Sequence, residues 1–402
     1  MKNKLGKKGK IIIGILTPVG ALLLAFLILC IVTMSAYSPS FLGRVLTHWD
    51  SSVTDYKVFP ERKIQKSEKP YFYTKNIDSF LENVTVSYSG KQKSLKEFVK
   101  STKTTSFIIV KHDEIVYEQY ANGFDENSIN TSFSMAKTVV SLLIGKAIEN
   151  GHIKSVKEPI SNYISELKDK NTGKTTIEDL LLMRSDIVYN ENKFLWFGDD
   201  TLTYWHDDLR QLALNHTALT DKYSGNFHYN NYHPLLLGII LERSTGVTVS
   251  EFFEREIWQK IGAEHDASWS LDSKKSGFEK MESGINFRAV DFVKIGSMVL
   301  HGGYWNGLQI INGDWLDSST KCTIPINDSE YKNSFLAGKN IGYQYMWYCV
   351  PTQSGYDIVA WGKSDQILYI SPANDTVILR TGKTDGGVSN WVETLKNLIT
   401  QL

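Results

Sequence analysis

The sequence predicts an α/β (α+β) fold: an antiparallel sheet flanked by helices, with an inserted all-helical subdomain and one N-terminal transmembrane helix. Three observations predict it. Strand-like segments lie towards both ends of the 402-residue chain, helical periodicity dominates between them, and the chain opens with a long apolar run. Because strands from both ends have to bury their apolar faces in a common core, we expect them to join in one sheet.

The N-terminus combines a basic cluster with the apolar run. Five lysines among the first ten residues precede an uncharged stretch from Ile11 to Gly43. Its apolar part, residues 11–34, is longer than the about 20 residues that a membrane-spanning helix needs. Since basic residues stay on the cytoplasmic side, residues 1–10 are predicted to form a cytoplasmic tail and 11–34 a signal anchor in the cell membrane, with everything after them outside. A cleavable signal peptide with a cut near Ser35 or Ala36 is the alternative.

Residues 35–75 follow this helix and mix prolines, lysines and scattered aromatics without a sustained period. Such a segment is typical of an extended arm between a membrane and a folded domain. The remaining residues, 76–402, are long enough to bury a sizeable core and are predicted to form that domain. The chain has 44 Lys plus Arg and 44 Asp plus Glu, and this balance makes a nucleic-acid partner unexpected.

Cysteine usage shows no disulfide framework, since only Cys322 and Cys349 occur outside the apolar run. An oxidising compartment allows such a pair to form a disulfide, but two buried thiols agree with the composition equally well. Both alternatives stay open, and the sequence also leaves the oligomeric state undetermined.

The sheet is predicted to begin with a hairpin. Residues 106–110 and 115–120 are β-rich runs on either side of a polar turn. After Thr131 the apolar residues change to helical spacing, until Gly151 ends the run as a C-cap would. Ser134 is therefore expected in the first turn of a buried helix.

Residues from 153 to about 316 are predicted to form the helical subdomain, because their apolar segments show helical spacing and no run of strands. Strand patterns return towards the end of the chain, and an amphipathic helix is predicted to close it. The strand segments are "GYQYMWYCV", "YDIVAWG", "QILYISP" and "DTVILRTG", and the helix is "NWVETLKNLITQL".

Ser134 and Lys137, in the stretch "FSMAK", have the spacing of a nucleophile and its base. A serine hydroxyl reacts only when a nearby base takes its proton, and a lysine three residues later on a helix lies one turn away on the same face. The helix N-terminus also stabilises an anionic intermediate and favours a neutral lysine. Ser-x-x-Lys alone is a weak motif, and its position at the start of a strongly apolar helix strengthens it.

A second candidate motif, "YNN", places Tyr229 and Asn231 before another apolar helix. A phenol relays a proton between lysine, serine and a leaving group, and an asparagine side chain binds a lysine or a substrate amide. Tyr223 and Tyr232 are competitors for the role of Tyr229 that the spacing does not exclude.

A third candidate motif interrupts the strand pattern of "VAWGKSDQILYI" with Gly362 and Lys363. A glycine at this place allows the backbone to approach a ligand closely. A free strand amide next to it, together with the amide of Ser134, is able to form an oxyanion hole. A simple β-bulge is the alternative.

Taken together, these motifs resemble those of the penicillin-recognising serine hydrolases, namely class C β-lactamases, D-alanyl-D-alanine carboxypeptidases and related esterases. The sequence is most similar to the branch of 6-aminohexanoate-dimer (nylon-oligomer) hydrolases, over most of the chain after Phe41. Besides "SMAK" and "YNN", the similar stretches are "RVLTHWDSSVTDYKVFPERKI", "TTIEDLLLMRS", "ASWSLD", "ESGINFRAVDFVKIG" and "SPANDTVILRTG". The resemblance implies a β-lactamase/transpeptidase-like fold.

The resemblance implies an acyl-enzyme mechanism for three residues. Ser134 is expected to form the acyl-enzyme, Lys137 to activate it, and Tyr229 to assist proton transfer. The expected reaction is hydrolysis of an ester or amide outside the cytoplasm, on a cell-envelope substrate such as a D-alanyl ester or peptide. A D-alanyl-D-alanine carboxypeptidase or β-lactamase-type amidase is the alternative, and a catalytically inactive wall-binding scaffold is an alternative of another class.

The resemblance places the other candidate residues around the substrate. Asn231 is expected in the polar network of the second motif, and Gly362 and Lys363 on the strand that lines the cleft, with the Lys363 amide in the oxyanion hole. Two residues depart from the family pattern, because Asp365 and Asp186 stand where glycine is usual. Acidic side chains near the cleft would oppose a carboxylate-bearing substrate such as penicillin or a peptide C-terminus, although Lys363 would offset them.

Several chemistries have no motif in this sequence. Its nine histidines are dispersed, and it has no His-Glu-x-x-His, Cys-x-x-Cys, phosphate-loop or dinucleotide-glycine pattern. His228 and His233 flank the second motif and are interpreted as structural. The sequence therefore predicts neither a metal nor a cofactor.

Overall fold

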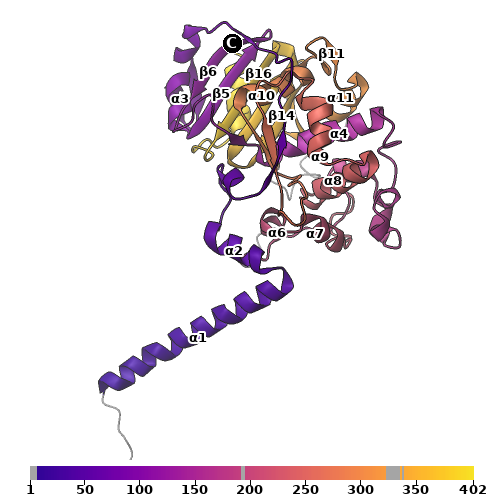
Figure 1. Cartoon of the computed structure of the whole chain (residues 1–402). Helices are drawn as coiled ribbons and strands as arrows, with labels where there is room; N and C mark the ends of the chain where they lie inside the picture. Colours follow the sequence, from indigo (N-terminus) through magenta and orange to yellow (C-terminus); the bar gives the residue numbers. More distant parts are fainter. Residues whose placement is uncertain (1–6, 192–194, 323–335, 337–338) are drawn as a thin grey trace, which may run out of the picture.

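The computed structural model describes residues 7–191, 195–322, 336 and 339–402, and its centre is an eight-stranded sheet (Figure 1). The strand order is β12-β13-β14-β15-β16-β5-β6-β2, and all neighbours are antiparallel except β6 and β2. The strands are β2 (Thr74–Lys75), β5 (Thr104–Lys111), β6 (Glu114–Tyr120), β12 (Gly342–Gln344), β13 (Trp347–Thr352), β14 (Gly355–Gly362), β15 (Gln366–Ser371) and β16 (Thr376–Gly382). Because β16 pairs with β5, the prediction of one sheet from both ends of the chain is confirmed.

Helices cover both faces of this sheet. Side chains alternate across a strand, so Val377 and Arg380 of β16 lie on opposite faces. Val377 packs against Gly296 of α10 (Ala289–Leu300), whereas the guanidinium of Arg380 lies 4.3 Å from the ring centroid of Trp391 in α13 (Trp391–Ile399). The ring of Trp391 also contacts Phe98 of α3 (Leu95–Ser101), so α13 and α3 lie together on the face opposite to α10.

The region between the two halves of the sheet is built around α4 (Ala136–Glu149) and α8 (Tyr232–Thr245), which pack on each other. Both helices are buried along nearly their whole length, as their continuous apolar sequences require. The other helices of the region are α5 (Ile177–Leu181), α6 (Asp199–Trp205), α7 (Leu209–Asn215), α9 (Val249–Phe253) and α11 (Gly313–Thr320).

The inserted region is not wholly helical, and that part of the fold prediction was wrong. A second sheet, of order β1-β8-β9-β7, contains β8 (Ala267–Ser270) and β9 (Ile285–Phe287) from this region. Its other strands are β1 (Glu61–Ile64) and β7 (Asn130–Thr131). Segments of three or four fully buried residues show no alternation of apolar and polar side chains, so their sequence carries no strand period. Further short strands are β3 (Thr85–Tyr88), β4 (Lys91–Ser94), β10 (Tyr304–Trp305) and β11 (Leu308–Gln309).

The N-terminal helix, α1 (Lys7–Ala36), leads away from the rest of the molecule (Figure 1). Among the described residues it is the one helix long and apolar enough to cross a membrane, over Val19–Ala36. Its last turns touch the folded domain, where the indole nitrogen of Trp196 donates a hydrogen bond of 2.9 Å to Thr33 Oγ1. A membrane anchor and a signal sequence both agree with such a helix.

Residues 35–75 were expected to be extended, and this expectation was wrong. They contain α2 (Pro39–His48) and strand β1, which pairs with β8. Ser38 caps α2 by accepting a hydrogen bond from the amide of Phe41, and Pro39 suits the first helical position because it lacks an amide hydrogen. This segment therefore returns along the domain instead of spanning open space.

The alternatives left open for Cys322 and Cys349 are also decided, because the two form a disulfide.

Candidate active site

Ser134 lies in a short 3-10 turn, Phe133–Met135, that leads directly into α4. The sequence placed it in the first turn of the helix, so the structure moves it to the turn just before. This position directs the free amides and the positive dipole end of a long buried helix towards the serine. Phe133 has a φ of 43°, a left-handed conformation that only a tightly constrained turn imposes on a bulky residue.

Lys137 contacts Ser134 directly. Its Nζ lies 3.0 Å from Ser134 Oγ and donates a second hydrogen bond, also of 3.0 Å, to the main-chain carbonyl of Glu282. The same nitrogen is 4.9 Å from the ring centroid of Tyr229. Lys137 is buried, at 2% exposure, so these contacts hold its amine in one place beside the serine. The predicted nucleophile and base are therefore adjacent in the folded chain.

Tyr229, and neither of its competitors, lies at this site. It lines a cavity together with Ser134 and shares a side-chain hydrogen bond with Tyr348 of β13. Burial and the neighbouring Tyr229 raise the pKa of Tyr348, which keeps that phenol protonated. Tyr223 instead stacks on His228, and Tyr232 donates a hydrogen bond to Asp199.

Gly362 brings the end of β14 against the serine. A Cβ atom on this glycine would lie 2.6 Å from the carbonyl oxygen of Ser132 and 2.9 Å from the amide nitrogen of Ser134. Both neighbours are backbone atoms that have no room to move, so only glycine fits. The structure thus explains why a glycine interrupts this strand and places the amide that follows it next to that of Ser134.

Hydrogen bonds from Arg380 stabilise the turn after Gly362. Ser364 and Asp365 have φ values of 58° and 55°, a conformation that glycine adopts more readily. Nη1 of Arg380 donates hydrogen bonds to both of their carbonyl oxygens, of 2.5 and 2.8 Å. Gln366 adds a 3.2 Å hydrogen bond to the carbonyl of Lys363. These buried contacts fix the turn at the edge of the site.

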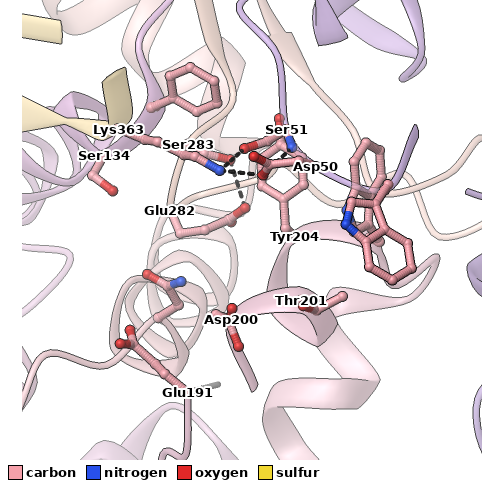
Figure 2. A pocket seen from close by; sticks show the side chains of 14 residues that line it. Asp50, Ser51, Ser134, Glu191, Asp200, Thr201, Tyr204, Glu282, Ser283 and Lys363 are labelled. Carbon is pink, nitrogen blue, oxygen red and sulfur yellow. Dashed lines mark hydrogen bonds and ion pairs between the residues drawn. The ribbon is translucent and has the colours of Figure 1, made fainter. Parts of the chain in front are cut away.

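Two neighbouring cavities reach Ser134, and Lys363 lines both of them. Figure 2 shows the first, in which side chains from the N-terminal segment, from the loop before α6 and from α6 surround the serine. Its lining includes four carboxylates, those of Asp50, Glu191, Asp200 and Glu282. An excess of acidic groups in a cavity attracts groups that carry a positive charge.

The partners of these carboxylates differ. Glu282 is 3.1 Å from the ammonium of Lys280, so its charge is balanced within the protein. Asp200 Oδ1 and Asn231 Oδ1 are buried without a hydrogen-bond partner in the described part of the chain. Partial burial and repulsion from Asp200 raise the pKa of Glu191, while Lys137 acts in the opposite direction. Buried acceptors without a donor indicate a site that a donor from a ligand would satisfy.

Asn231 belongs to a polar network with residues of two other segments. Its amide nitrogen donates to the hydroxyls of Tyr189, at 2.8 Å, and Thr203, at 3.2 Å. Asn231 lines the first cavity, and its Oδ1 is buried without a hydrogen-bond partner among the described residues. The second hydrogen bond of the Lys137 amine goes to the main-chain carbonyl of Glu282.

The two departures from the family pattern have different positions. Asp365 lines the second cavity, where burial raises the pKa of its carboxyl and a 2.8 Å hydrogen bond from the Trp361 indole opposes that rise. Asp186 lines neither cavity, because its carboxylate accepts the amide hydrogen of Gly225. Its φ of 59° is the left-handed conformation in which the usual glycine is common. The expectation that Asp186 acts on the substrate was therefore wrong.

Several lining residues were missed by the sequence analysis: Asp50, Ser51, Glu191, Asp200, Tyr204 and Glu282. Most of them lie in short or irregular segments, where no spacing distinguishes a site residue from a surface one. The stretch "ESGINF", which includes Glu282, was noted for its family resemblance alone. His228 and His233 line neither cavity, and His233 is buried against Ser185.

The arrangement has a counterpart among known proteins. A family model described as beta-lactamase matches residues 92–305, more than half of the chain. The chain belongs to the beta-lactamase family. Its members are serine hydrolases, so the protein is an enzyme of that class, and the resemblance stated from the motifs is confirmed.

Two related sequences add detail to this assignment. A 6-aminohexanoate-dimer hydrolase from Paenarthrobacter ureafaciens is 24% identical over 310 residues, which cover 74% of this chain and 77% of that protein. A teichoic acid D-alanine hydrolase from Staphylococcus aureus (strain MRSA252) is 24% identical over 243 residues. That match covers 58% of this chain and 53% of the relative, so it spans about half of the relative's length.

Solved structures of this beta-lactamase family confirm the fold. A protein from Bacillus anthracis assigned as a 6-aminohexanoate-dimer hydrolase has a TM-score of 0.73 at 23% identity, over 87% of this chain and 92% of its own. A penicillin binding protein from Bacillus halodurans has a TM-score of 0.58 at 14% identity, over 77% of this chain and 100% of its own. The mixed fold predicted from the sequence is thus the fold of the family.

Proposed function

We propose that this serine hydrolase is anchored in the cell membrane and cleaves an ester or amide of the cell envelope through an acyl-enzyme on Ser134. The acyl group we propose is an aminoacyl group with a free ammonium, such as a D-alanyl ester. The observation that carries this proposal is the 3.0 Å contact between Ser134 Oγ and Lys137 Nζ beside an acid-lined cavity.

The reaction follows from the positions of the side chains. Lys137 takes the hydroxyl proton as Ser134 Oγ attacks the substrate carbonyl carbon. The oxyanion that forms is stabilised by the amides of Ser134 and Lys363. The proton then passes by way of Tyr229 to the leaving oxygen or nitrogen, its bond to the carbonyl carbon breaks, and the acyl-enzyme remains. A water molecule, deprotonated by the same groups, releases the acid and restores Ser134.

The substrate class follows from charge. Glu191 and Asp200 lie on the side of the first cavity opposite Lys363 (Figure 2). An ammonium group on the acyl part of a substrate would supply the hydrogen-bond donors that Asp200 Oδ1 and Asn231 Oδ1 lack. The similarity to a teichoic acid D-alanine hydrolase supports the same substrate class.

Neutralising the acidic wall is expected to weaken binding of charged substrates selectively. We expect Glu191→Gln and Asp200→Asn each to raise KM for a D-alanyl p-nitrophenyl ester by about fivefold to tenfold, because each removes one attraction for the ammonium. Turnover of p-nitrophenyl propionate, which lacks only the amino group, should stay within about twofold. Glu97→Gln is the matched charge control, because Glu97 is an exposed residue of α3 that lies far from Glu191 and Asp200 in the sequence. Equal losses on both esters would contradict this role.

The proposed nucleophile is tested by covalent labelling. A fluorophosphonate probe is expected to modify the full-length protein on one peptide, the one containing Ser134, and mass spectrometry of the digest locates the label. Labelling that persists in Ser134→Ala would refute the acyl-enzyme mechanism. Parallel incubation with D-alanylated teichoic acid, muropeptides and aminohexanoate dimer then ranks the substrate classes. Stable acylation by labelled penicillin would favour the carboxypeptidase or β-lactamase alternative instead.

A further inference from the structure

The segment Trp49–Ser51, which leads from α2 into the domain, forms one wall of the cavity beside Ser134. It does so through an ion pair with the other side of the cleft. Asp50 Oδ1 lies 2.5 Å from Lys363 Nζ, and Ser51 Oγ lies 2.7 Å from the same nitrogen (Figure 2). The ammonium of Lys363 is therefore bound by a segment that lies more than 300 residues away in sequence.

Further contacts hold this segment in place. The amide of Ser51 donates a hydrogen bond of 2.7 Å to Asp50 Oδ1 and so orients the carboxylate. A little further along, Asp55 accepts hydrogen bonds from the amide of Ser52, at 2.8 Å, and from the hydroxyl of Tyr204, at 2.7 Å. Tyr204 itself lines the same cavity. The approach of Asp50 to the cleft is thus fixed by three neighbouring residues.

Lys363 is the cation that a substrate carboxylate would meet here. It follows Gly362, whose backbone touches the amide of Ser134, and its side chain lines both cavities that reach the serine. Lys137 is buried and engaged at the serine, and Lys280 is buried and paired with Glu282. With Asp50 and Ser51 on its ammonium, Lys363 has its charge balanced and two of its three N–H donors engaged.

We propose that Asp50 is a specificity-determining residue of the active site, which holds the ammonium of Lys363 and thereby makes the cleft reject carboxylate-bearing substrates. The inference rests on the proposed function in one respect, since Ser134 has to mark where the reacting carbonyl lies. The segment Trp49–Ser51 is thereby assigned a part in the active site. A substrate anion would have to displace Asp50 from Lys363, in a cavity whose opposite side carries Glu191, so like charges oppose it twice.

Asp50→Asn separates this role from a role in stability. Asp50 and Lys363 have exposed fractions of 74% and 49%, and exposed ion pairs add little to stability, so the variant should unfold at the same temperature as the parent chain. With Lys363 released, we expect the second-order rate of Ser134 acylation by benzylpenicillin to rise about tenfold. In that step the β-lactam C–N bond breaks, the Ser134 Oγ–C bond forms, and the serine proton moves to the ring nitrogen. The ratio of this rate to the turnover of p-nitrophenyl propionate, which carries no carboxylate, should rise by the same factor.

Two controls make the result specific. Asp50→Asn combined with Lys363→Met keeps the backbone amide but removes the released ammonium, so it should lose the gain. Glu68→Gln makes the same charge change at an exposed site of the same N-terminal segment and should match the parent. A penicillin rate that does not rise in Asp50→Asn, or that rises equally in Glu68→Gln, would overturn the proposal.

A binding measurement keeps this test independent of the proposed reaction. Calorimetry on the full-length chain compares N-acetyl-D-alanine with N-acetyl-D-alaninamide, which differ in the carboxylate alone. Asp50→Asn is expected to tighten binding of the acid about tenfold and to leave that of the amide unchanged. If the parent chain hydrolyses no ester, the acyl-enzyme proposal fails while this comparison still decides the role of Asp50. Equal Kd changes for acid and amide would refute it.

Discussion

Replacing Lys137 with alanine is expected to lower kcat for p-nitrophenyl propionate by about 10³-fold, because Ser134 then has no base for its proton. In the structure its amine is 3.0 Å from Ser134 Oγ and is held there by the carbonyl of Glu282. KM should change little, since Lys137 acts on the nucleophile. Steady-state kinetics and the rate of fluorophosphonate labelling measure the loss.

Lys146→Ala is the matched control for this variant. Lys146 lies on the same helix, is buried to 5% exposure, and pairs with Glu149 away from the site. Both variants remove a buried lysine from α4, so a shared loss of stability would appear in both thermal unfolding curves. A kcat in Lys137→Ala within tenfold of that in Lys146→Ala would show that another group is the base. It would also revive the alternative of a scaffold with incidental activity.

A second large effect is expected from Gly362→Ala. The added methyl group would lie 2.6 Å from Ser132 O and 2.9 Å from the amide nitrogen of Ser134. Because a Cβ atom cannot approach backbone this closely, β14 and the serine turn have to move apart. This displacement separates the two proposed oxyanion donors, and the loss of one such donor lowers kcat by about 10²- to 10³-fold.

Gly313→Ala is the control for the glycine variant. Gly313 begins α11 and a Cβ atom there would lie 3.5 Å from the nearest atom, Gly302 O, which is ordinary contact. We expect it to keep full activity and the parent unfolding temperature. If Gly362→Ala also keeps its kcat, the amides of Ser134 and Lys363 do not form the oxyanion hole. In that case another pair of donors has to be sought around the two cavities.

The long elements were predictable because their patterns are local. The hairpin of β5 and β6, the helix α4 and the four final strands each repeat an apolar period over enough residues to be recognised. Strands β8 and β9 were missed because three or four buried residues do not complete a period. Helix α2 was missed as well, because it has ten residues and its proline and glycine are typical of loops.

The active site was predictable to the extent that its residues carry spacing. Ser134 and Lys137 are joined by one helical turn, and Gly362 interrupts a strand pattern. Tyr229 had competitors, and it was distinguished only when the packing of β13 placed Tyr348 beside it. The acidic wall had no signal at all, because Glu191 and Asp200 meet the serine through contacts between distant segments.

By itself, the sequence determined the apolar N-terminal helix, the sheet built from both ends of the chain, the pairing of Ser134 with Lys137, and the family. These features depend on local periodicity and on short motifs that a chain shows before it folds. Only the tertiary structure decided the disulfide, the choice of Tyr229 and the charge around the serine. The pairing of Asp50 with Lys363 belongs to this second group, since it needs the chain after α2 to return to the cleft. Such contacts arise from packing between distant segments, which no spacing along the chain records.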